Sequence, residues 1–278
     1  MKALVTGGAG FLGSHLTDKL VELGHEVIII DNLLTGDEAN INPNAKFVKA
    51  DIRSYSDILP YFEGVDWVFH TAAIARTPWT VEDPRLCTEI NVTGTVNVLE
   101  AARAHKVKRV VHSSSCILYV PNTPYYASKL AAEEYLKIYM KLYDVSCIGL
   151  RYSNLYGKRQ SEKGPSPNVF ASFRKSKKET GRVWVTGDGE QSRDYLHSSD
   201  VVAANILAAQ SDYRGIMDIC TGQNTSLNEV IKYFDCPVDY IGERLGDIKH
   251  IYTDAKTAKD ILGFEAKTKL VDGISDVL

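Results

Sequence analysis

Long apolar runs are missing from this chain of 278 residues. The stretch from Val27 to Ile30 has only the length of a strand, whereas a helix that spans a bilayer needs about 20 apolar residues. Met1 and Lys2 lead directly into a short apolar stretch and then glycines, without the long apolar region and cleavage site of an export signal. The sequence therefore predicts a cytosolic protein that does not associate with membranes.

An excess of charge of one sign is also missing. The chain has 32 basic and 35 acidic side chains and a formal net charge of −3, so nucleic acid is not expected as a partner. One basic stretch, Arg174 to Lys178, interrupts a helical pattern. Because Glu179 follows at once, we interpret this stretch as the solvated face of a helix; a patch that binds a polyanion is the alternative.

Cysteine pairs and metal-ligand spacings are absent as well. The five cysteines are scattered without a CxxC pair, which favours reduced and mostly buried thiols over disulfides. The seven histidines show no HExxH pattern, and we predict no metal site. The cysteines are Cys87, Cys116, Cys147, Cys220 and Cys236.

Up to about residue 150 the sequence alternates short β-branched runs with longer amphipathic segments. Apolar residues from Phe11 to Leu23 recur at steps of three or four before Gly24, as in a helix that connects two parallel strands. This rhythm predicts an α/β fold with a parallel sheet. Beyond it the order loosens, with a loop at residues 164–167. The predicted strands are Ala3 to Val5, Val27 to Ile30, Lys46 to Val48, Trp67 to Phe69, Arg109 to His112 and Ser146 to Leu150.

Glycines with the spacing GxxGxxG follow the first predicted strand and precede the first predicted helix. Gly7 can form the tight turn, Gly10 lets the backbone approach a pyrophosphate, and Gly13 lets helix and strand pack closely. The N-terminus of the helix offers unpaired N–H groups to phosphates. We predict that this turn, together with Phe11 and Leu12, holds a dinucleotide in a doubly wound Rossmann fold.

An acid ends the second predicted strand. Asp31 lies about 20 residues after the glycines, where a carboxylate accepts hydrogen bonds from both ribose hydroxyls. The same carboxylate repels a 2′-phosphate, and the segment that begins at Asn32 has no arginine to offset it. The sequence therefore predicts NAD rather than NADP, with Asp31 and Asn32 in contact with it.

Two more strand ends are candidates for cofactor contacts. Asp51 and Ile52 follow the third strand, where they can meet an adenine edge; alternatively, Asp51 caps a helix. Thr71, Ala72 and Ala73 follow the fourth strand. Their small side chains leave space for the cofactor to lie across them, or they indicate tight packing.

A serine cluster and a tyrosine–lysine pair carry the candidate chemistry. Ser113 to Ser115 follow the strand at Arg109 to His112, and Tyr125 and Lys129 open a helical run. A spacing of four puts phenol and ammonium on one helix face, where the lysine charge is expected to lower the tyrosine pKa. Such a phenol can remove a hydroxyl proton while hydride leaves the same carbon. YxxxK alone usually marks a surface pair; the glycine turn and the serines favour the catalytic interpretation.

Taken together, these segments resemble the extended short-chain dehydrogenases/reductases, specifically the nucleotide-sugar epimerase and dehydratase branch, over nearly the whole chain. The resemblance implies that Tyr125 is the base, that Lys129 anchors the nicotinamide ribose, and that Ser115 hydrogen-bonds the reacting hydroxyl. It also implies that Asn91 supports the active-site helix at the cofactor site. Further matching segments are Asn91 to Thr95, Arg151 to Gly157, Gly187 to Gly189 and Arg193 to Tyr195.

The resemblance places substrate contacts in the second half of the chain. Asn154 matches a residue that binds the diphosphate of a nucleotide sugar. Arg193 and Arg244 lie in segments similar to those whose arginines clamp that diphosphate, a task that suits the guanidinium fork. Without the resemblance, either arginine would be read as a surface ion-pair partner. Asn168 and Val169 complete the implied contacts, and the implied substrate is a UDP-hexose.

The residues after the catalytic serine indicate the reaction. Cys116 and Ile117 stand where dehydratases and decarboxylases of this branch usually carry an acid, which favours a 4-epimerase similar to UDP-glucose 4-epimerase. A reductase, dehydratase or decarboxylase of the branch, and a non-catalytic NAD sensor, are the alternatives. Nine residues separate Ser115 from Tyr125, where the family has about 20 or more, and Val120 replaces a glycine. A loop over the substrate is thus missing, which opens the site or changes its specificity.

The resemblance also implies how the chain is divided and assembled. We expect an NAD-binding Rossmann domain over residues 1–150 and a smaller α/β substrate-binding region over residues 151–278. The segment 193–212 is expected to pack back on the first domain. A homodimer through the helices that begin near Asn91 and Tyr125 is expected as well.

Overall fold

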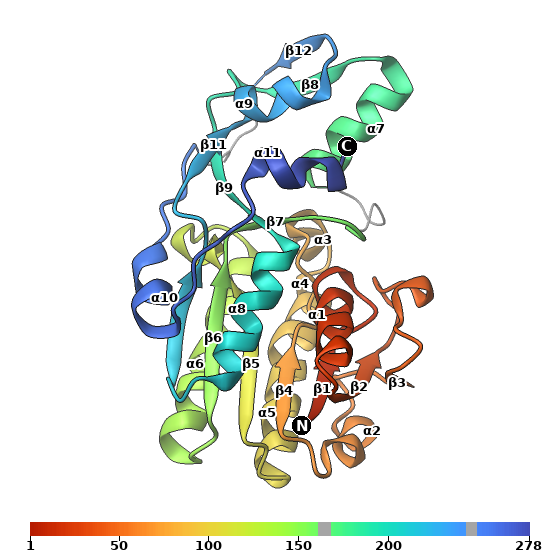
Figure 1. Cartoon of the computed structure of the whole chain (residues 1–278), viewed down its shortest axis with the longest axis vertical. Coiled ribbons are helices and arrows are strands. Elements are labelled where there is room, and N and C mark those ends of the chain that lie inside the picture. The colour runs from red at the N-terminus through yellow and green to blue at the C-terminus, as the bar shows by residue number, and fades with distance from the viewer. Residues whose placement is uncertain (161–167, 243–248) are drawn as a thin grey trace.

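A seven-stranded parallel sheet forms the centre of the computed structural model, which describes residues 1–160, 168–242 and 249–278 (Figure 1). The strand order is β10-β6-β5-β4-β1-β2-β3, and the loop predicted at residues 164–167 lies outside the described residues. The strands are β1 (Lys2–Thr6), β2 (Glu26–Asp31), β3 (Lys46–Lys49), β4 (Trp67–His70), β5 (Arg109–Ser115), β6 (Cys147–Tyr152) and β10 (Gly215–Ile219).

The six predicted strands are confirmed, each slightly longer than its apolar run. The largest extension is in β5, which continues through the three serines to Ser115. There it pairs in register with β6, with Ser115 opposite Tyr152. The polar residues remain in strand conformation because the neighbouring strand supplies their hydrogen bonds. The extension carries the serines to the carboxyl edge of the sheet.

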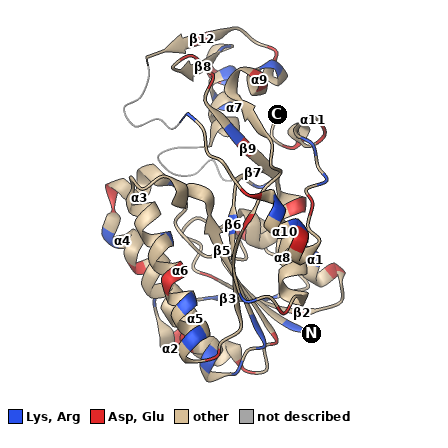
Figure 2. Cartoon of the chain, turned by 90° about the vertical axis from the view of Figure 1, so that its left-hand side faces the viewer, with Lys and Arg blue, Asp and Glu red and all other residues tan. Residues whose placement is uncertain are grey.

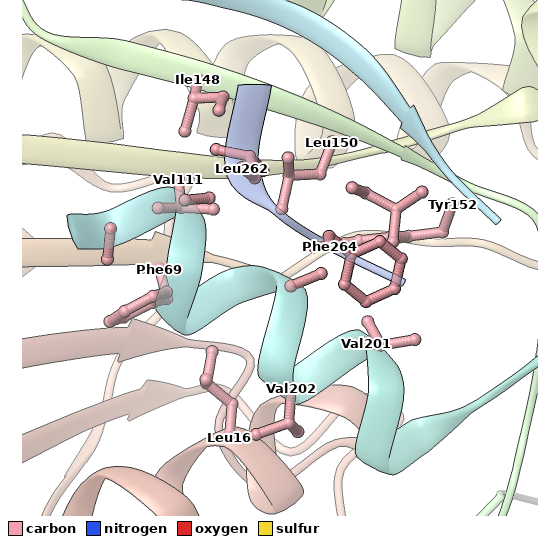
Figure 3. Close-up of a cluster of buried hydrophobic side chains, with 14 of the residues drawn as sticks. Leu16, Phe69, Val111, Ile148, Leu150, Tyr152, Val201, Val202, Leu262 and Phe264 are labelled. Carbon is pink, nitrogen blue, oxygen red and sulfur yellow. The ribbon is translucent and has the colours of Figure 1, made fainter. Parts of the chain in front are cut away.

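Two apolar layers cover the sheet, one on each face. On one face, α1 (Phe11–Glu22), α8 (Ser198–Gln210) and α10 (Ala255–Leu262) pack through residues such as Leu16, Val202 and Leu262 (Figure 3). On the other face lie α2 (Tyr55–Ile58), α5 (Gly94–Ala104) and α6 (Pro124–Leu142), with Val98 and Leu136 buried. Strands covered on both sides must be apolar throughout, which explains the continuous apolar runs.

A smaller lobe stands over one end of the sheet (Figure 1). Its own core includes Tyr156, Phe170 and Phe234. We propose that the chain divides into two lobes near residue 150. α8, β10 and α10 come later in the chain but belong to the lobe of the large sheet, which they join. The remaining elements are β7 (Asn154–Tyr156), α7 (Val169–Thr180), β8 (Val183–Thr186), β9 (Ser192–His197), β11 (Asn224–Ser226), α9 (Leu227–Ile231), β12 (Val238–Ile241) and α11 (Leu270–Gly273). Two further short helices, α3 (Thr77–Glu82) and α4 (Pro84–Thr88), follow β4.

The basic stretch at Arg174 to Lys178 does not interrupt a helix: α7 runs through it without a break. Lys175, Lys177 and Lys178 are exposed, in agreement with a solvated helix face. Basic and acidic residues are also interspersed along α4, α5 and α6 (Figure 2). None of the helices that the structure describes is long and apolar enough to cross a membrane. All five cysteines are unpaired, and four of them are buried.

The closest approach between α1 and the turn before it occurs at Gly13. A Cβ atom at this position would lie 2.2 Å from the backbone oxygen of Gly7 and 2.8 Å from its carbonyl carbon. Backbone atoms cannot rotate away as a side chain can, so only glycine fits here without displacing the helix.

We therefore expect Gly13→Ala to destabilise the protein by about 1–3 kcal/mol, the usual cost of overpacking a filled site. The midpoint of urea unfolding would fall accordingly. Gly242→Ala is the matched control, because a Cβ atom there meets nothing within 4 Å. Equal midpoints for the two variants would contradict this account of Gly13.

Candidate active site

A cleft of about 500 Å³ runs along the carboxyl edge of the large sheet and is also lined by Arg193 of the smaller lobe. It is lined by residues from the ends of β1, β2, β3, β4, β5 and β6. All the predicted cofactor residues except Asn91 line it, as do the three predicted catalytic residues. Those cofactor residues are Gly7, Gly10, Phe11, Leu12, Gly13, Asp31, Asn32, Asp51, Ile52, Thr71, Ala72, Ala73, Tyr125 and Lys129.

The glycine turn places the start of α1 at this cleft. Gly7 adopts the left-handed region, with φ of 74°, and its N–H donates to the carbonyl oxygen of Ile30 at 2.8 Å. Gly10 precedes the helix without a side-chain cap, and no acidic residue occupies the first turn. The first N–H groups of α1 are therefore available to an anion, as a dinucleotide pyrophosphate requires.

Asp31 ends β2 beside this turn and is 8% exposed. Its carboxylate accepts hydrogen bonds from the backbone N–H groups of Ala9 at 3.0 Å and Leu33 at 2.8 Å. Burial raises the pKa of Asp31, and these two hydrogen bonds oppose the rise. Each carboxylate oxygen has a further lone pair, so the side chain can still accept from ribose hydroxyls.

Asp51 does not cap a helix, because the residue that precedes α2 is Ser54. Its carboxylate is instead bound by two side chains: Arg53 donates at 2.8 Å and Asn32 at 2.8 Å. The Arg53 hydrogen bond is the main reason that the pKa of Asp51 falls to about 2. Asp51 is thus a charged group at the cleft wall whose position is fixed by Arg53 and Asn32.

Ser115, Tyr125 and Lys129 meet where β5 ends and α6 begins. Ser115 lies close enough to the Tyr125 hydroxyl to lower its pKa, and Ser115 Oγ accepts from the backbone N–H of Ile117 at 3.2 Å. The ammonium group of Lys129 donates to the carbonyl oxygen of Ser113 at 2.7 Å and lies 5.9 Å from the centre of the Tyr125 ring. The three side chains predicted from their spacing therefore form one constellation.

The expected direction of the Tyr125 pKa shift is wrong. Burial raises the pKa of Tyr125 to about 12, and the hydrogen bond with Ser115 is the interaction that lowers it, not the charge of Lys129. Lys129 is buried as well, and burial lowers its pKa to about 8. The spacing of four residues correctly placed both groups on one helix face. It could not show that the fold removes water from both of them.

Asn91 does not line the cleft. Its side chain instead supports α6, the helix that carries Tyr125 and Lys129. Its amide nitrogen donates to Ser128 Oγ on α6 at 3.0 Å and to the carbonyl oxygen of Ile74 at 3.0 Å. Its amide oxygen accepts from the N–H of Ile74 at 2.8 Å. Asn91 therefore joins α6 to the segment after β4, which is itself part of the cleft wall.

The predicted substrate residues gather at a second cavity of about 200 Å³ in the smaller lobe. Asn154, Asn168, Val169 and Arg193 line it. Asn154 and Arg193 also line the main cleft, so the two cavities meet at these side chains. The guanidinium of Arg193 donates to the carbonyl oxygen of Ser192 at 2.7 Å. Arg244 lies outside the described residues.

Sequence reasoning missed several residues of the cleft wall. Arg76 and Trp79 come from the segment after β4, Gln160 follows β7, and Ile251 comes from the last part of the chain. No spacing or motif in the sequence marks these residues, because only the tertiary fold brings them to the cleft. Gln191 lines the second cavity in the same way, whereas Tyr195, which also lines it, belongs to the matching segment Arg193 to Tyr195.

Comparison with known proteins agrees with this geometry. The model of the NAD dependent epimerase/dehydratase family matches residues 3–220. A protein of Methanocaldococcus jannaschii, provisionally named UDP-glucose 4-epimerase, is 39% identical over 99% of this chain and 96% of its own length. The crystal structure of UDP-glucose 4-epimerase with UDP-glucose from Thermotoga maritima is 34% identical and superposes with a TM-score of 0.94, covering 100% of this chain and 97% of that one. The Thermus thermophilus UDP-glucose 4-epimerase complex with NAD is 32% identical, with a TM-score of 0.90, covering 100% and 97%.

The chain therefore belongs to the NAD dependent epimerase/dehydratase family, and it is an enzyme that uses NAD. The site residues fit this cofactor: the turn is closed to any side chain at Gly13, the start of α1 is uncapped, and Asp31 stands at the end of β2. The relatives named above are UDP-glucose 4-epimerases.

We expect Ser115→Ala to raise the pKa of Tyr125 further, because the substitution removes the hydrogen bond that lowers it. A phenol that acts as a base must lose its proton, so the acid limb of the kcat profile should move to higher pH. At neutral pH the rate should fall by about 100-fold. Ser113→Ala is the control, because its backbone carbonyl, rather than its hydroxyl, binds Lys129. An acid limb that stays in place would contradict this assignment.

Proposed function

We propose that the protein is a UDP-hexose 4-epimerase, an isomerase that inverts carbon 4 of the sugar through a transient keto intermediate. The observation that carries the proposal is the absence of an acid near Ser115. Among the described residues of the main cleft, the only carboxylates are Asp31 and Asp51, at the ends of β2 and β3. Elimination of water needs an acid or base beyond Tyr125, and epimerisation does not.

The residue after Ser115 supports this choice. Cys116 lines the cleft, but burial raises the pKa of its thiol far above the usual range, and Sγ donates to the carbonyl oxygen of Arg151 at 3.3 Å. The thiol therefore holds its proton too tightly at working pH to act as the acid of a dehydratase.

In this proposal Tyr125 takes the proton of the 4-hydroxyl and later returns it. Ser115 hydrogen-bonds the reacting oxygen and lowers the pKa of Tyr125, and Lys129, fixed by the Ser113 carbonyl, contacts the ribose of the cofactor. Bound NAD supplies a hydride acceptor that gives the same hydride back, so no cofactor is consumed. Asp31 selects NAD by accepting the ribose hydroxyls.

The two connected cavities account for the other end of the substrate. We place the nucleoside in the second cavity, against Asn168 and Val169, and the diphosphate where the cavities meet, at Asn154 and Arg193. The guanidinium at this junction matches the charge and geometry of a diphosphate. The sugar then extends into the main cleft toward Ser115. One relative was solved with UDP-glucose and another with NAD, which supports a site that holds both kinds of ligand.

We also propose that the protein is a homodimer that pairs through α5 and α6. These helices lie side by side on one face of the sheet (Figure 2). The outer side of α6 exposes Tyr135, Ile138 and Leu142, at 38%, 41% and 64%. Their spacing of three and four residues makes one apolar stripe, which water does not favour and a second copy can cover.

The purified protein with NAD should interconvert UDP-glucose and UDP-galactose, followed by NMR or chromatography, without release of NADH. Tyr125→Phe removes only the hydroxyl that carries the proton and should slow this reaction by at least 100-fold. Tyr240→Phe is the control, since its hydroxyl bonds Asn228 in the smaller lobe.

A panel that includes the N-acetylated sugars distinguishes the other functions. Free NADH would indicate a net reductase or dehydrogenase, and loss of water or carbon dioxide a dehydratase or decarboxylase. NAD binding without turnover of any nucleotide sugar would indicate a sensor.

Light scattering after size exclusion should give twice the chain mass of 30.8 kDa for the wild type at micromolar concentration. Ile138→Glu puts a charge in the apolar stripe and should shift the mass to 30.8 kDa. Val271→Glu changes an equally apolar residue on α11 that is 57% exposed, and should remain dimeric. A wild type that elutes with the mass of one chain would refute the dimer.

A further inference from the structure

The connection between Ser115 and α6 is short, and residues of other elements hold it in place. A single turn of 3₁₀ helix, Cys116–Tyr119, follows β5 directly, and only residues 120–123 separate it from α6. Ser115 directly precedes this turn and must keep its place there, because it lines the cleft together with Tyr125. The question is which contacts fix the turn.

Tyr119, the last residue of the turn, is bound at its hydroxyl. The Tyr119 hydroxyl lies 2.9 Å from each carboxylate oxygen of Asp218, on the edge strand β10. Asp218 is 4% exposed and also accepts from the backbone N–H of Asp254 at 3.0 Å. The carboxylate is thus fixed from a second side, and its hydrogen bond ties the turn to the edge of the sheet.

The same hydroxyl joins a larger network, which is buried at Glu133. Arg151 on β6 donates to it at 3.5 Å and binds the carboxylate of Glu133 through two nitrogens, at 2.6 and 2.8 Å. Glu133 has no exposed surface and lies one turn after Lys129 on α6. Ser114, the neighbour of Ser115, donates to Glu133 at 2.6 Å. The network therefore connects β5, α6, β6 and β10 around the catalytic serine and lysine.

The turn transmits this restraint to Ser115 through its backbone. The N–H of Ile117 donates to Ser115 Oγ at 3.2 Å, so the conformation of the turn selects the Ser115 rotamer. The N–H of Val120 closes the turn on the carbonyl oxygen of Ile117 at 2.8 Å. Because Ser115 Oγ accepts from Ile117, its own proton is directed elsewhere, to Tyr125 or to a substrate oxygen.

We infer that Tyr119 is a positioning residue: held by Asp218, it fixes the turn that aims Ser115 at Tyr125 and the sugar hydroxyl. The expected change in kinetics rests on the proposed function. The expected change in structure rests only on the contacts described above. The ring of Tyr119 is 45% exposed, so the side chain adds little to the core, and its hydroxyl is the part that matters. Tyr119→Phe keeps the ring and removes only that hydroxyl.

The kinetic test compares wild type, Tyr119→Phe and Tyr240→Phe with UDP-glucose over a range of pH. Loss of the hydrogen bond between Tyr119 and Asp218 should lower kcat by about tenfold and change KM by no more than about twofold from the wild-type value. The weakened Ser115 contact should move the acid limb of kcat to higher pH, an effect that a general loss of stability does not produce. Asp218→Asn should add little to Tyr119→Phe in the double variant, because the hydrogen bond between these two side chains is already lost and the amide oxygen of the introduced asparagine can still accept from the N–H of Asp254.

The structural test needs no substrate and uses hydrogen exchange of a peptide that contains Ile117 and Val120. In Tyr119→Phe the exchange of these two amides should be about tenfold faster than in wild type, and in Tyr240→Phe unchanged. Unchanged exchange overturns the inference, as does an active variant with an unmoved acid limb. A wild type that turns over no UDP-hexose refutes the proposed function alone, and hydrogen exchange then still decides the role of Tyr119.

Discussion

All strands of the large sheet run in the same direction, and the active site depends on this constraint. Parallel strands bring their carboxyl ends to one edge, and there the glycine turn after β1, Asp31 after β2 and the serines of β5 come together. These residues are far apart in the sequence, and no local interaction joins them. The shared edge also explains why the site residues of β1, β2 and β5 lie at the ends of apolar runs, where the strands leave the core and polar groups can face the cleft; Tyr125 and Lys129 come from α6.

At that edge, the pKa values of Tyr125 and Lys129 depend more on the burial of these side chains than on each other's charge. Burial raises the pKa of Tyr125 and lowers that of Lys129, so it favours the neutral form of both. The hydrogen bond from Ser115 is what favours the phenolate. A serine hydroxyl has one proton to give, and its direction is set by the backbone of the following turn. In the mechanism that we propose, the geometry of a few main-chain atoms therefore bears directly on proton transfer.

Most of the fold and the cofactor side of the cleft could be predicted from the sequence, because those signals are local. Gly7, Gly13 and Asp31 are each defined by their distance from a strand end. The alternatives at Asp51 could not be decided, since Arg53 and Asn32 compete for the carboxylate and Ser54 precedes the helix instead. The pKa of Tyr125 was predicted in the wrong direction because burial is set by packing across the whole fold. Residues such as Trp79 and Ile251 carry no pattern, and only the path of the chain brings them to the cleft.

The path of the chain has one more consequence. The chain leaves the large sheet after β6, returns to it for α8 and β10, leaves again for β11, α9 and β12, and returns with α10 before α11 joins the smaller lobe (Figure 1). No single cut in the backbone separates the lobes. A gene fragment that ends after β6 lacks the edge strand and with it Asp218, so neither lobe can be exchanged between relatives as one continuous module. Specificity in such a chain changes by substitution along the cleft, not by swapping of parts.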